Sequence, residues 1–570
     1  MKLLLVVAAA LLGVVASAQI EIQVEEVSYT DPYDGDYPLL GYVSIPDETP
    51  APAVVIIPDI SSVDDYEKTR ATMLNKDLGY VGFAADIFGP DFVDANSSVW
   101  REQAGLYRGN NSLFFGRIQA AVDVMMQHPD VIADKVAVIG YCFGGTGILT
   151  YSFLGATDVV GAVSFHGGLT DFPVDQTINH PVLVLSGGAD DTGTEVDTLE
   201  NSLNAANATW QITRYSGIEH AFTNWNDTRG RYSERADSRS WQEMATFLGE
   251  AFGSFEYGTN PPNSTDVAAV DYDDNGFELT GYLSIPPGAE MDKTPAVVIV
   301  PDWDGVSGPD GYEAERATLL AQAGYVGFAA DIYGADKQQV ESFDERVELT
   351  TLYRTNYTLF VSRIQAAVDL VAAHELVDPE SVFLIGYCFG GTGVVDYSFA
   401  ADVTKVKVVV PFHGGLTGLA PIETDVVYPY VLVQSGGEDD AHGNNTELEM
   451  MLDAANATWE ISRYSNVYHG FTHWGGGAYN PLADWRSWDA MMGVFEMVTK
   501  SDHDDYEDDG HGHSHDHGDE DDHGEEEMEG EESTNGADDA ESTNGATSAC
   551  WSQHQGFAGL VLLSMISFLL

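Results

Sequence analysis

Short apolar runs rich in valine and isoleucine alternate with helical stretches through the first half of the chain. An uninterrupted apolar run of strand length predicts a strand that is buried on both faces of a sheet. The alternation is typical of an α/β fold with a mostly parallel sheet flanked by helices, whose sites lie at the carboxyl ends of the strands. The expected strands are residues 52–59, 81–88, 135–141, 159–165 and 181–186, and the expected helices are residues 66–78, 117–127, 144–154 and 195–206.

The same pattern recurs in the second half of the chain. Residues 117–123 and 363–369 both read Arg-Ile-Gln-Ala-Ala-Val-Asp, and residues 80–86 and 325–331 both read Tyr-Val-Gly-Phe-Ala-Ala-Asp. A repeat of this length is a duplicated domain rather than a unit of a solenoid. The predicted parts are a first domain at residues 20–255, a linker rich in Gly, Asn and Pro at residues 256–265, and a second domain at residues 266–500.

Both ends of the chain carry targeting patterns. Residues 1–18 combine one lysine, a short apolar run and an Ala-Ser-Ala cleavage pattern, which together predict a signal peptide. Residues 550–570 contain an apolar run that is short for a helix crossing a bilayer, so a glycolipid (GPI) anchor signal is favoured over a short transmembrane tail. We therefore expect a protein of the secretory pathway that is extracellular or held on the cell surface, with the membrane as a partner through this C-terminal segment.

Sequons for N-glycosylation agree with export, although single sequons also arise by chance. Two pairs fall at matching places in the repeats, Asn110 with Asn356 and Asn207 with Asn456. The acceptors are Asn96, Asn110, Asn207, Asn226, Asn263, Asn356, Asn444 and Asn456.

The chain is strongly acidic, with 91 acidic and 24 basic residues and a formal net charge of −67. A field of this sign repels nucleic acid and anionic lipid, so we expect no nucleic-acid partner and a neutral or cation-bearing small molecule as ligand. Residues 501–549 form an acidic, His-rich tail that cannot bury a core and is predicted to be disordered. A solvated spacer is the favoured interpretation of this tail, and loose metal binding is the alternative. The histidines that could bind such a metal are His511, His513, His515 and His517.

Each repeat keeps one cysteine at the centre of the same sequence. Cys142 and Cys388 both lie in Gly-Tyr-Cys-Phe-Gly-Gly, between a predicted strand and a predicted helix. In a tight strand-to-helix turn the positions two before and two after the cysteine, here Gly140 and Gly144, have no room for a Cβ. The turn points the sulfur at a helix N-terminus, which lowers a thiol pKa and can stabilise an oxyanion. The pattern predicts a nucleophile elbow, and a pair of buried apolar cysteines is the alternative.

Nucleophilic acyl transfer also needs a base close to the thiol and an acid that orients the base, and in an elbow-type fold both follow the nucleophile in the chain. In the first repeat the acid is Asp190 or Asp191, directly after a buried strand, and in the second it is Asp439 or Asp440. A turn-forming or helix-capping role is the alternative for these aspartates.

A histidine follows the acid in each repeat. His220 and His469 lie in a loop after a strand and close ahead of a phenylalanine, and their recurrence favours a general base over a lone surface histidine. His166 and His413 precede the acid in the chain, so we expect them to line the pocket.

Both repeats resemble the dienelactone hydrolase family of the α/β-hydrolase fold through Gly-Tyr-Cys-Phe-Gly-Gly, Gly-Gly-x-Asp and the His-x-Phe loop. The resemblance covers most of residues 20–500 and implies a Cys-Asp-His triad in each repeat. The implied triads are Cys142, Asp190 and His220 in the first repeat, and Cys388, Asp439 and His469 in the second.

The resemblance also implies supporting groups around each cysteine. Asp59 and Asp302 stand after an early strand, where the best-known members of the family carry a glutamate that helps to deprotonate the thiol. The backbone N–H groups implied for the oxyanion hole are those of Ile60 and Phe143 in the first repeat, and of Trp303 and Phe389 in the second.

Bacterial members of the family bind the carboxylate of their lactone with arginines, and neither corresponding place in this chain holds one. The sequence therefore favours a surface-held hydrolase that cleaves small neutral esters or lactones in two duplicated domains, without a cofactor. The alternative is a non-catalytic surface scaffold whose acidic, His-rich tail binds metal or mineral.

Overall fold

The computed structural model describes residues 20–504. Within this range the gaps are residues 90–91, 93–96, 175, 255–260, 263, 290–292, 401–404, 423–428 and 440–443. The expected signal peptide, most of the linker, the tail beyond Asp504 and the C-terminal anchor segment lie outside the described residues, so export and anchoring stay predictions. Among the helices that are described, none combines the length and the apolar character needed to cross a membrane.

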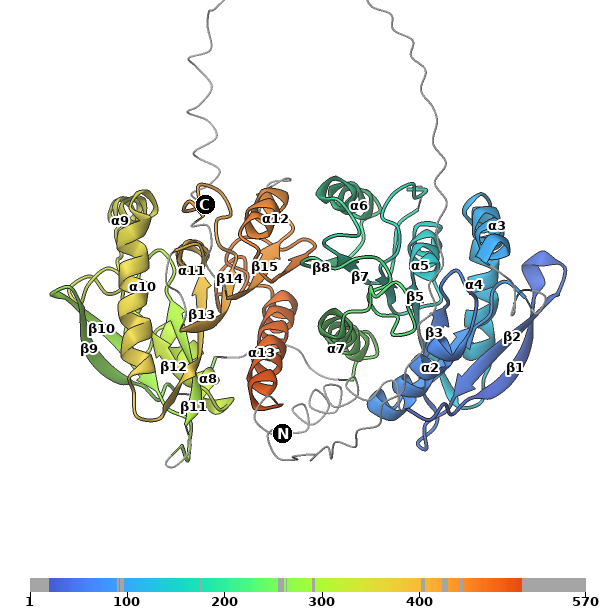
Figure 1. Cartoon of the computed structure of the whole chain (residues 1–570), viewed down its shortest axis with the longest axis horizontal. Helices are drawn as coiled ribbons and strands as arrows, with labels where there is room; N and C mark the ends of the chain where they lie inside the picture. Colours follow the sequence, from blue (N-terminus) through green and yellow to red (C-terminus); the bar gives the residue numbers. More distant parts are fainter. Residues whose placement is uncertain are drawn as a thin grey trace, which may run out of the picture. The chain divides into compact units, whose positions relative to one another are not determined.

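The strands of the described residues form one sixteen-stranded sheet (Figure 1). Its order is β1-β2-β4-β3-β5-β6-β7-β8-β16-β15-β14-β13-β11-β12-β10-β9, which reads the same in both repeats outward from the β8–β16 pair. The strands of the first repeat are β1 (Glu25–Asp31), β2 (Tyr37–Ser44), β3 (Ala51–Ile57), β4 (Val81–Ala85), β5 (Val131–Tyr141), β6 (Ala162–Phe165), β7 (Val182–Gly187) and β8 (Trp210–Tyr215). Those of the second are β9 (Ala268–Asp274), β10 (Phe277–Ser284), β11 (Thr294–Val300), β12 (Val326–Ala329), β13 (Val377–Tyr387), β14 (Val406–Phe412), β15 (Tyr430–Gly436) and β16 (Trp459–Tyr464).

Helices cover both faces of the sheet (Figure 1). The helices of the first repeat are α2 (Asp65–Leu78), α3 (Ser97–Arg108), α4 (Asn111–Met126), α5 (Phe143–Phe153), α6 (Gly193–Ala205) and α7 (Glu234–Ala251), with a short 3-10 turn, η2 (Pro32–Asp34). Those of the second are α8 (Tyr312–Gln322), α9 (Phe343–Thr355), α10 (Tyr357–Ala372), α11 (Phe389–Ser398), α12 (Asn444–Ala454) and α13 (Pro481–Asp504). The last helix therefore runs four residues into the predicted tail.

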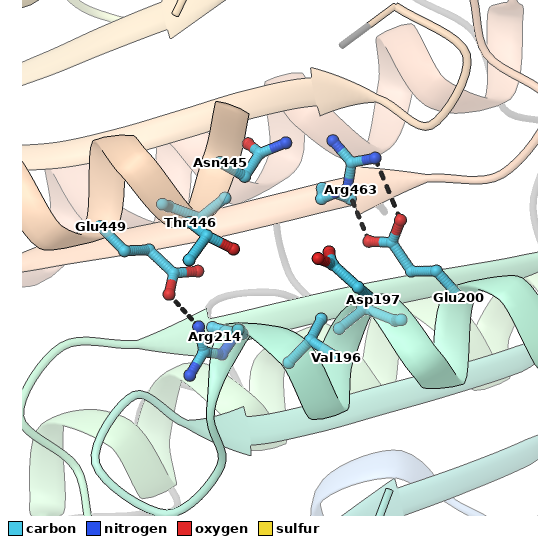
Figure 2. Close-up of a pocket in the computed structure, with 11 residues that line it drawn as sticks. Val196, Asp197, Glu200, Arg214, Asn445, Thr446, Glu449 and Arg463 are labelled. Carbon is cyan, nitrogen blue, oxygen red and sulfur yellow. Dashed lines mark hydrogen bonds and ion pairs between the residues drawn. The ribbon is translucent and has the colours of Figure 1, made fainter. Parts of the chain in front are cut away.

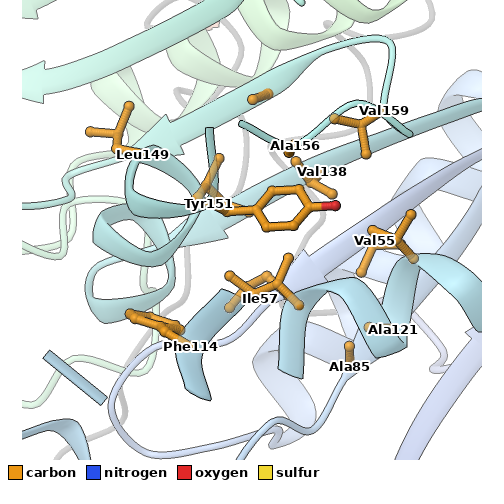
Figure 3. Close-up of a cluster of buried hydrophobic side chains, with 14 of the residues drawn as sticks. Val55, Ile57, Ala85, Phe114, Ala121, Val138, Leu149, Tyr151, Ala156 and Val159 are labelled. Carbon is orange, nitrogen blue, oxygen red and sulfur yellow. The ribbon is translucent and has the colours of Figure 1, made fainter. Parts of the chain in front are cut away.

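The core is divided between the two faces because successive side chains of a strand point to opposite sides. In the first repeat Val55 and Ile57 of β3 pack with α4 and α5 on one face (Figure 3), while Val54 and Ile56 pack with α2 and α7 on the other. All four side chains are fully buried. The continuous apolar runs of the sequence thus give the strands of a sheet that is buried on both faces, and the predicted α/β fold class is confirmed.

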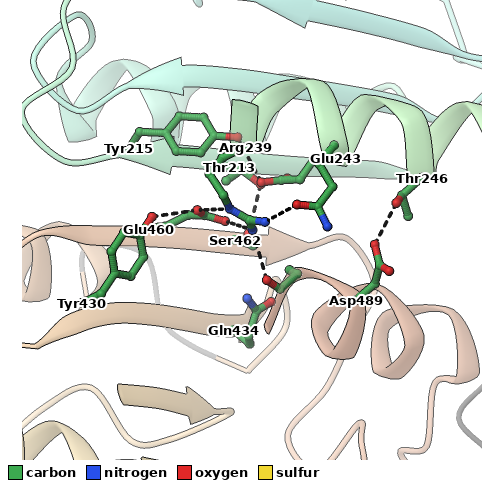
Figure 4. Close-up of polar contacts among 12 residues, drawn as sticks. Thr213, Tyr215, Arg239, Glu243, Thr246, Tyr430, Gln434, Glu460, Ser462 and Asp489 are labelled. Atoms are coloured by element: carbon green, nitrogen blue, oxygen red, sulfur yellow. Dashed lines mark hydrogen bonds and ion pairs between the residues drawn. The ribbon is translucent and has the colours of Figure 1, made fainter. Parts of the chain in front are cut away.

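The two repeats join through one antiparallel strand pair, β8 with β16, in which Thr213 lies opposite Ser462. Buried polar groups hold this junction (Figure 4). Arg239 of α7 forms an ion pair with Glu460 of β16 at 2.9 Å between Nη2 and Oε1, and both side chains are at most 1% exposed. The hydroxyl of Tyr430 donates to the same carboxylate at 3.0 Å. The two repeats therefore share a sheet, an arrangement that the sequence pattern does not indicate.

The matched sequons have local structural roles. Asn110 and Asn356 are the N-cap residues of α4 and α10, and each side chain accepts a hydrogen bond from a backbone N–H of the first turn. Asn207 and Asn456 take the left-handed backbone conformation, with φ of 53° and 52°, which asparagine tolerates better than most residues. The recurrence of these four asparagines follows from the fold without reference to glycosylation, which stays a prediction.

Candidate active site

Each cysteine lies at the turn between a central strand and the helix that follows it. Cys142 is the N-cap residue of α5, with φ of 55° and ψ of −113°, and Cys388 is the N-cap residue of α11, with φ of 55° and ψ of −114°. A left-handed backbone is costly for a residue with a side chain and is held only where the surroundings impose it. The first N–H groups of a helix have no partner within the helix, and in the second repeat the N–H of Phe389 lowers the pKa of the Cys388 thiol.

Close packing explains the glycines on either side of Cys142, as expected from the sequence. A Cβ on Gly140 would collide with the carbonyl oxygen of Gly144, and a Cβ on Gly144 would collide with the carbonyl oxygen of Ile57. Gly386 and Gly390 meet the equivalent backbone atoms in the second repeat. The strand, the turn and the helix approach each other too closely for any residue but glycine at these positions.

The structure brings the three residues of each implied triad together. In the first repeat, His220 Nε2 lies 3.0 Å from Cys142 Sγ, and its Nδ1 lies 2.9 Å from Asp190 Oδ2. In the second repeat the equivalent distances are 3.0 Å from His469 to Cys388 and 2.9 Å from His469 to Asp439. These distances are those expected between a nucleophile, a base and the acid that orients the base.

The two adjacent aspartates of the first repeat have different partners. Asp190 contacts His220, whereas the carboxylate of Asp191 accepts a hydrogen bond from Ser186 at 2.7 Å. Burial raises the pKa of Asp191 to about 6. In the second repeat Asp439 contacts the histidine, and Asp440 lies outside the described residues.

The two histidines that were expected to line the pocket are instead buried behind the nucleophile. The backbone N–H of Cys142 donates to His166 Nδ1 at 3.1 Å, so the proton of the ring is on Nε2, which donates to Thr223 Oγ1 at 2.8 Å. Burial lowers the pKa of His166 well below its usual value. His413 makes the same contacts with Cys388 and Thr472. Each is a neutral positioning residue that holds the strained turn.

A buried ion pair fixes Thr223, the hydrogen-bond partner of His166. Arg70 of α2 donates from Nη2 to the carbonyl of Thr223 at 2.9 Å and to Asp237 of α7 at 2.5 Å. Both charged side chains are at most 1% exposed, and a buried charge needs such a partner. Arg316 and Asp484 repeat the pair in the second half. The loop that carries each candidate base is therefore fixed by two helices.

The contacts between cysteine, histidine and aspartate shift the pKa values of the site residues. Burial raises the pKa of the Cys388 thiol, but the charge of His469 and the hydrogen bond between them outweigh it, so the net pKa lies below the usual thiol value. Burial lowers the pKa of His469, while Cys388 and Asp439 raise it well above its usual value. In the first site burial lowers the pKa of His220, and hydrogen bonds with Asp190 and Cys142 raise it to about 10. The contacts of the second site therefore favour the thiolate form of Cys388 and the protonated form of His469.

This pairing gives a pH-dependent prediction. In a chain that carries Cys142→Ala and Cys550→Ala, Cys388 is the single cysteine, and we expect its alkylation by iodoacetamide to titrate with a midpoint below about 8.5, the usual thiol pKa. Adding His469→Ala removes the two largest contributions that lower the pKa of Cys388, its positive charge and its hydrogen bond, so the midpoint should rise. His473→Ala, at an exposed neighbour, is the control and should leave the midpoint in place. An unchanged midpoint in the His469 variant would show that the two groups are not paired.

A cavity of about 410 Å³ opens over Cys142. Its walls mix the triad with small polar and aromatic side chains. Arg108, at the end of α3, also lines it and is not among the residues predicted for the site. The equivalent Arg354 contributes to the low pKa of Cys388. The sequence signal was available, because both arginines follow Leu-Tyr at the same place in the repeats.

The supporting aspartates do not contact the sulfur in the described hydrogen bonds. Asp59 accepts hydrogen bonds from the backbone N–H and the hydroxyl of Ser61, at 2.7 and 2.5 Å, which turns its carboxylate toward its own loop. Burial raises the pKa of Asp302 well above its usual value, and Asp304, Glu313 and the neighbouring Cys388 raise it further, so this carboxylate and the thiol interact electrostatically.

The expected oxyanion donors lie on two elements. Phe143 and Phe389 are the first residues of α5 and α11, so their N–H groups have no partner within the helix. Ile60 and Trp303 are partly buried in the loops after β3 and β11, against the same core that contacts the cysteine.

Within the described residues, no group of three or more His, Cys, Asp or Glu side chains is arranged to hold a metal ion. The tail histidines, from His511 to His517, lie outside the described residues, so this result does not test them.

Comparison with known proteins gives two matched regions. The sequence profile of the Dienelactone hydrolase family matches residues 39–252 and 279–499, which is more than half of the chain and confirms the resemblance of both repeats. A relative from Aquifex aeolicus, provisionally named as a carboxymethylenebutenolidase, is 28% identical over 240 residues, which cover 40% of this chain and 98% of the relative.

Similar proteins are also found among other relatives and among solved structures. A Bradyrhizobium protein, provisionally named as a 2-oxo-3-(5-oxofuran-2-ylidene)propanoate lactonase, is 27% identical over 212 residues, covering 35% of this chain and 83% of that protein. Among solved structures, a dienelactone hydrolase-like promiscuous phosphotriesterase from metagenomic libraries shows 29% identity and a TM-score of 0.38, over 40% of this chain and 99% of that one.

Proposed function

The chain belongs to the dienelactone hydrolase family, and from this premise we propose that it cleaves ester or lactone bonds through a cysteine nucleophile in each of its two repeats. The family and the fold support a hydrolase of such bonds. The observation that carries the mechanism is the 3.0 Å approach of a histidine Nε2 to a cysteine Sγ, repeated in both halves, with an aspartate on the other ring nitrogen.

In the first site, the thiolate of Cys142 attacks the carbonyl carbon of the substrate, and the electron pair of the C=O bond moves to the oxygen. The N–H groups of Phe143 and Ile60 stabilise this oxyanion. When the C–O bond to the leaving group breaks, His220 Nε2 gives its proton to the departing oxygen. Asp190 holds Nδ1–H throughout and keeps the ring oriented.

Deacylation reverses the role of the histidine. Neutral His220 accepts a proton from a water molecule, whose oxygen attacks the acyl carbon, and the bond between carbon and Sγ breaks. The acid product leaves and the thiolate is restored next to the imidazolium. His166 does not take part in proton transfer, because one of its ring nitrogens is bonded to the backbone of Cys142 and the other to Thr223.

The proposed substrate is a small neutral ester or lactone. The cavity of about 410 Å³ has the size of a site for a small molecule and is partly lined by Phe114 and Phe172. The net charge of −67 opposes the approach of an anionic substrate. The positive charge of Arg108 in the pocket attracts an anionic substrate instead. The preference for neutral over anionic esters therefore depends on the balance between Arg108 and the net negative charge of the chain.

Comparison of phenyl acetate with monophenyl succinate tests this proposal. We expect turnover of both, with a higher kcat/KM for the neutral ester at low salt, because the acidic surface repels the succinate carboxylate. The preference should shrink in about 0.5 M salt, where the Debye length falls to a few ångström. Absence of turnover would contradict the proposed hydrolysis. Faster turnover of the anionic ester at low salt would contradict the neutral substrate class.

A further inference from the structure

Two ion pairs cross the junction between the repeats in a reciprocal arrangement (Figure 2). Arg214 of β8 pairs with Glu449 of α12 in the other repeat, and Arg463 of β16 pairs with Glu200 of α6. Arg463 Nε lies 2.6 Å from Glu200 Oε1, and both side chains are at most 6% exposed. Since these residues occupy equivalent positions in the two repeats, each repeat gives one arginine and one glutamate to the junction.

Arg214 also holds the loop that carries the proposed catalytic acid of the first repeat, and Arg463 contacts the strand that leads to the equivalent loop of the second. Arg214 Nη2 donates to the carbonyl of Asp191 at 2.6 Å and approaches that of Gly188 at 3.4 Å. These two carbonyls flank Asp190 in the loop between β7 and α6. In the second repeat, Arg463 Nη1 donates to Ser435, at the end of the strand that leads to Asp439, at 3.2 Å.

Tryptophans of the opposite repeat pack on the same two loops. A Cβ on Gly188 would lie 3.0 Å from the indole of Trp459, and a Cβ on Gly437 would lie 3.3 Å from the indole of Trp210. Both tryptophans are 1% exposed. The backbone N–H of Trp459 is itself fixed by Ser216 of the first repeat at 2.8 Å. Each acid loop is therefore covered by one side chain from the other half.

We propose that each repeat positions the acid loop of the other, so that Glu449 and Trp459 serve the Cys142 site while Glu200 and Trp210 serve the Cys388 site. This inference rests on the proposed hydrolysis. The four residues contact no reacting atom and are positioning residues. One repeat of this chain is then an incomplete catalytic unit, and both sites depend on the β8–β16 junction.

The electrostatic reason is the burial of Arg214, which is 3% exposed. Without the carboxylate of Glu449 the guanidinium keeps its bonds to the acid loop but loses its counter-charge, and an unpaired buried cation is strongly unfavourable. The arginine must then move toward water or draw another carboxylate, and either change shifts the loop that orients Asp190.

The test uses Glu449→Gln in two backgrounds of the full chain. Cys388→Ala leaves only the first site to report on phenyl acetate hydrolysis, and Cys142→Ala leaves only the second. We expect kcat of the first site to fall by about tenfold or more with a smaller change in KM, because small misplacements of catalytic groups act on the chemical step. The alkaline limb of its pH profile should move to lower pH, since Asp190 then raises the pKa of His220 less. Glu200→Gln should give the mirror image, with the larger loss at the second site.

A control variant and the distribution of the loss between the two sites decide how the result is interpreted. Glu447→Gln, at an exposed acid on the same helix, is the matched control and should change neither site. Glu449 belongs to the second repeat by sequence, so a loss confined to the second site would overturn the inference. An equal loss at both sites would indicate general destabilisation and would also overturn it. If neither site turns over phenyl acetate before any junction residue is changed, the proposed function itself has failed, which is a different outcome from active sites that are insensitive to Glu449.

Discussion

A chain in which both Cys142 and Cys388 are alanine is expected to lose nearly all hydrolysis of phenyl acetate. Each substitution removes the only atom that forms the acyl bond, while the histidine, the aspartate and the proposed oxyanion donors stay in place. Loss of the nucleophile from a triad of this kind lowers kcat by about six orders of magnitude, with the remaining rate coming from binding and the oxyanion hole.

The single variants divide the activity between the sites. Cys142→Ala should leave the rate of the second site, Cys388→Ala should leave that of the first, and the two rates should sum to that of the native chain. Cys550→Ala, at the third cysteine of the sequence, is the matched control and should retain the full rate. Undiminished hydrolysis by the double variant would rule out a cysteine nucleophile.

Gly144→Ala is expected to disable the first site although it adds only one methyl group. That methyl would collide with the carbonyl oxygen of Ile57, and backbone atoms cannot rotate away as a side chain can. The strand end that must yield leads to Ile60, one of the two proposed oxyanion donors. We expect kcat in the Cys388→Ala background to fall by roughly a hundredfold, in line with a shift of about 1 Å in the catalytic groups.

Overpacking should also lower the free energy of unfolding, by about 1–3 kcal/mol in a urea titration. Gly105→Ala is the control, because it lies within α3 and an added Cβ would meet no other heavy atom within 4 Å. It should leave the activity unchanged and raise the stability slightly, by up to about 1 kcal/mol. Native activity in the Gly144 variant would show that the close approach of strand and helix is not needed for catalysis.

The central strands could be predicted from the sequence because they are buried on both faces. The run expected at residues 52–59 is β3, Ala51–Ile57, and that at residues 135–141 is the end of β5. The edge strand β1 could not be predicted in the same way, since it is largely exposed and mixes charged with apolar residues. A strand of this kind is stabilised by pairing with its neighbour, which leaves a weak local pattern.

The residues of the candidate site could be predicted where their order in the chain identifies them. The cysteine, acid and histidine of each repeat follow the order of an elbow-type fold, and the structure places them within hydrogen-bond distance. Chain order could not separate Asp190 from Asp191, because only the loop geometry shows which carboxylate faces the histidine. From the order of residues in the chain we also expected His166 in the pocket, whereas the end of the strand turns this ring inward beneath Cys142.

No local sequence pattern predicts the junction between the repeats. Thr213 and Ser462 pair across β8 and β16 although 249 residues separate them, and each strand alone reads as an ordinary buried strand. The repeated Arg-Tyr-Ser sequence before each histidine was visible, but its arginine acquires a role only when the opposite repeat supplies a glutamate.

Covalent catalysis by both cysteines can be observed in the intact mass of the chain quenched during turnover of phenyl acetate. This mechanism predicts adducts of one and two acetyl groups on the native chain, located on Cys142 and Cys388 by peptide mapping, and none at these positions in the double alanine variant. Rapid turnover with no acetyl group on either cysteine, under conditions in which acetylated thiols survive the quench, would contradict it.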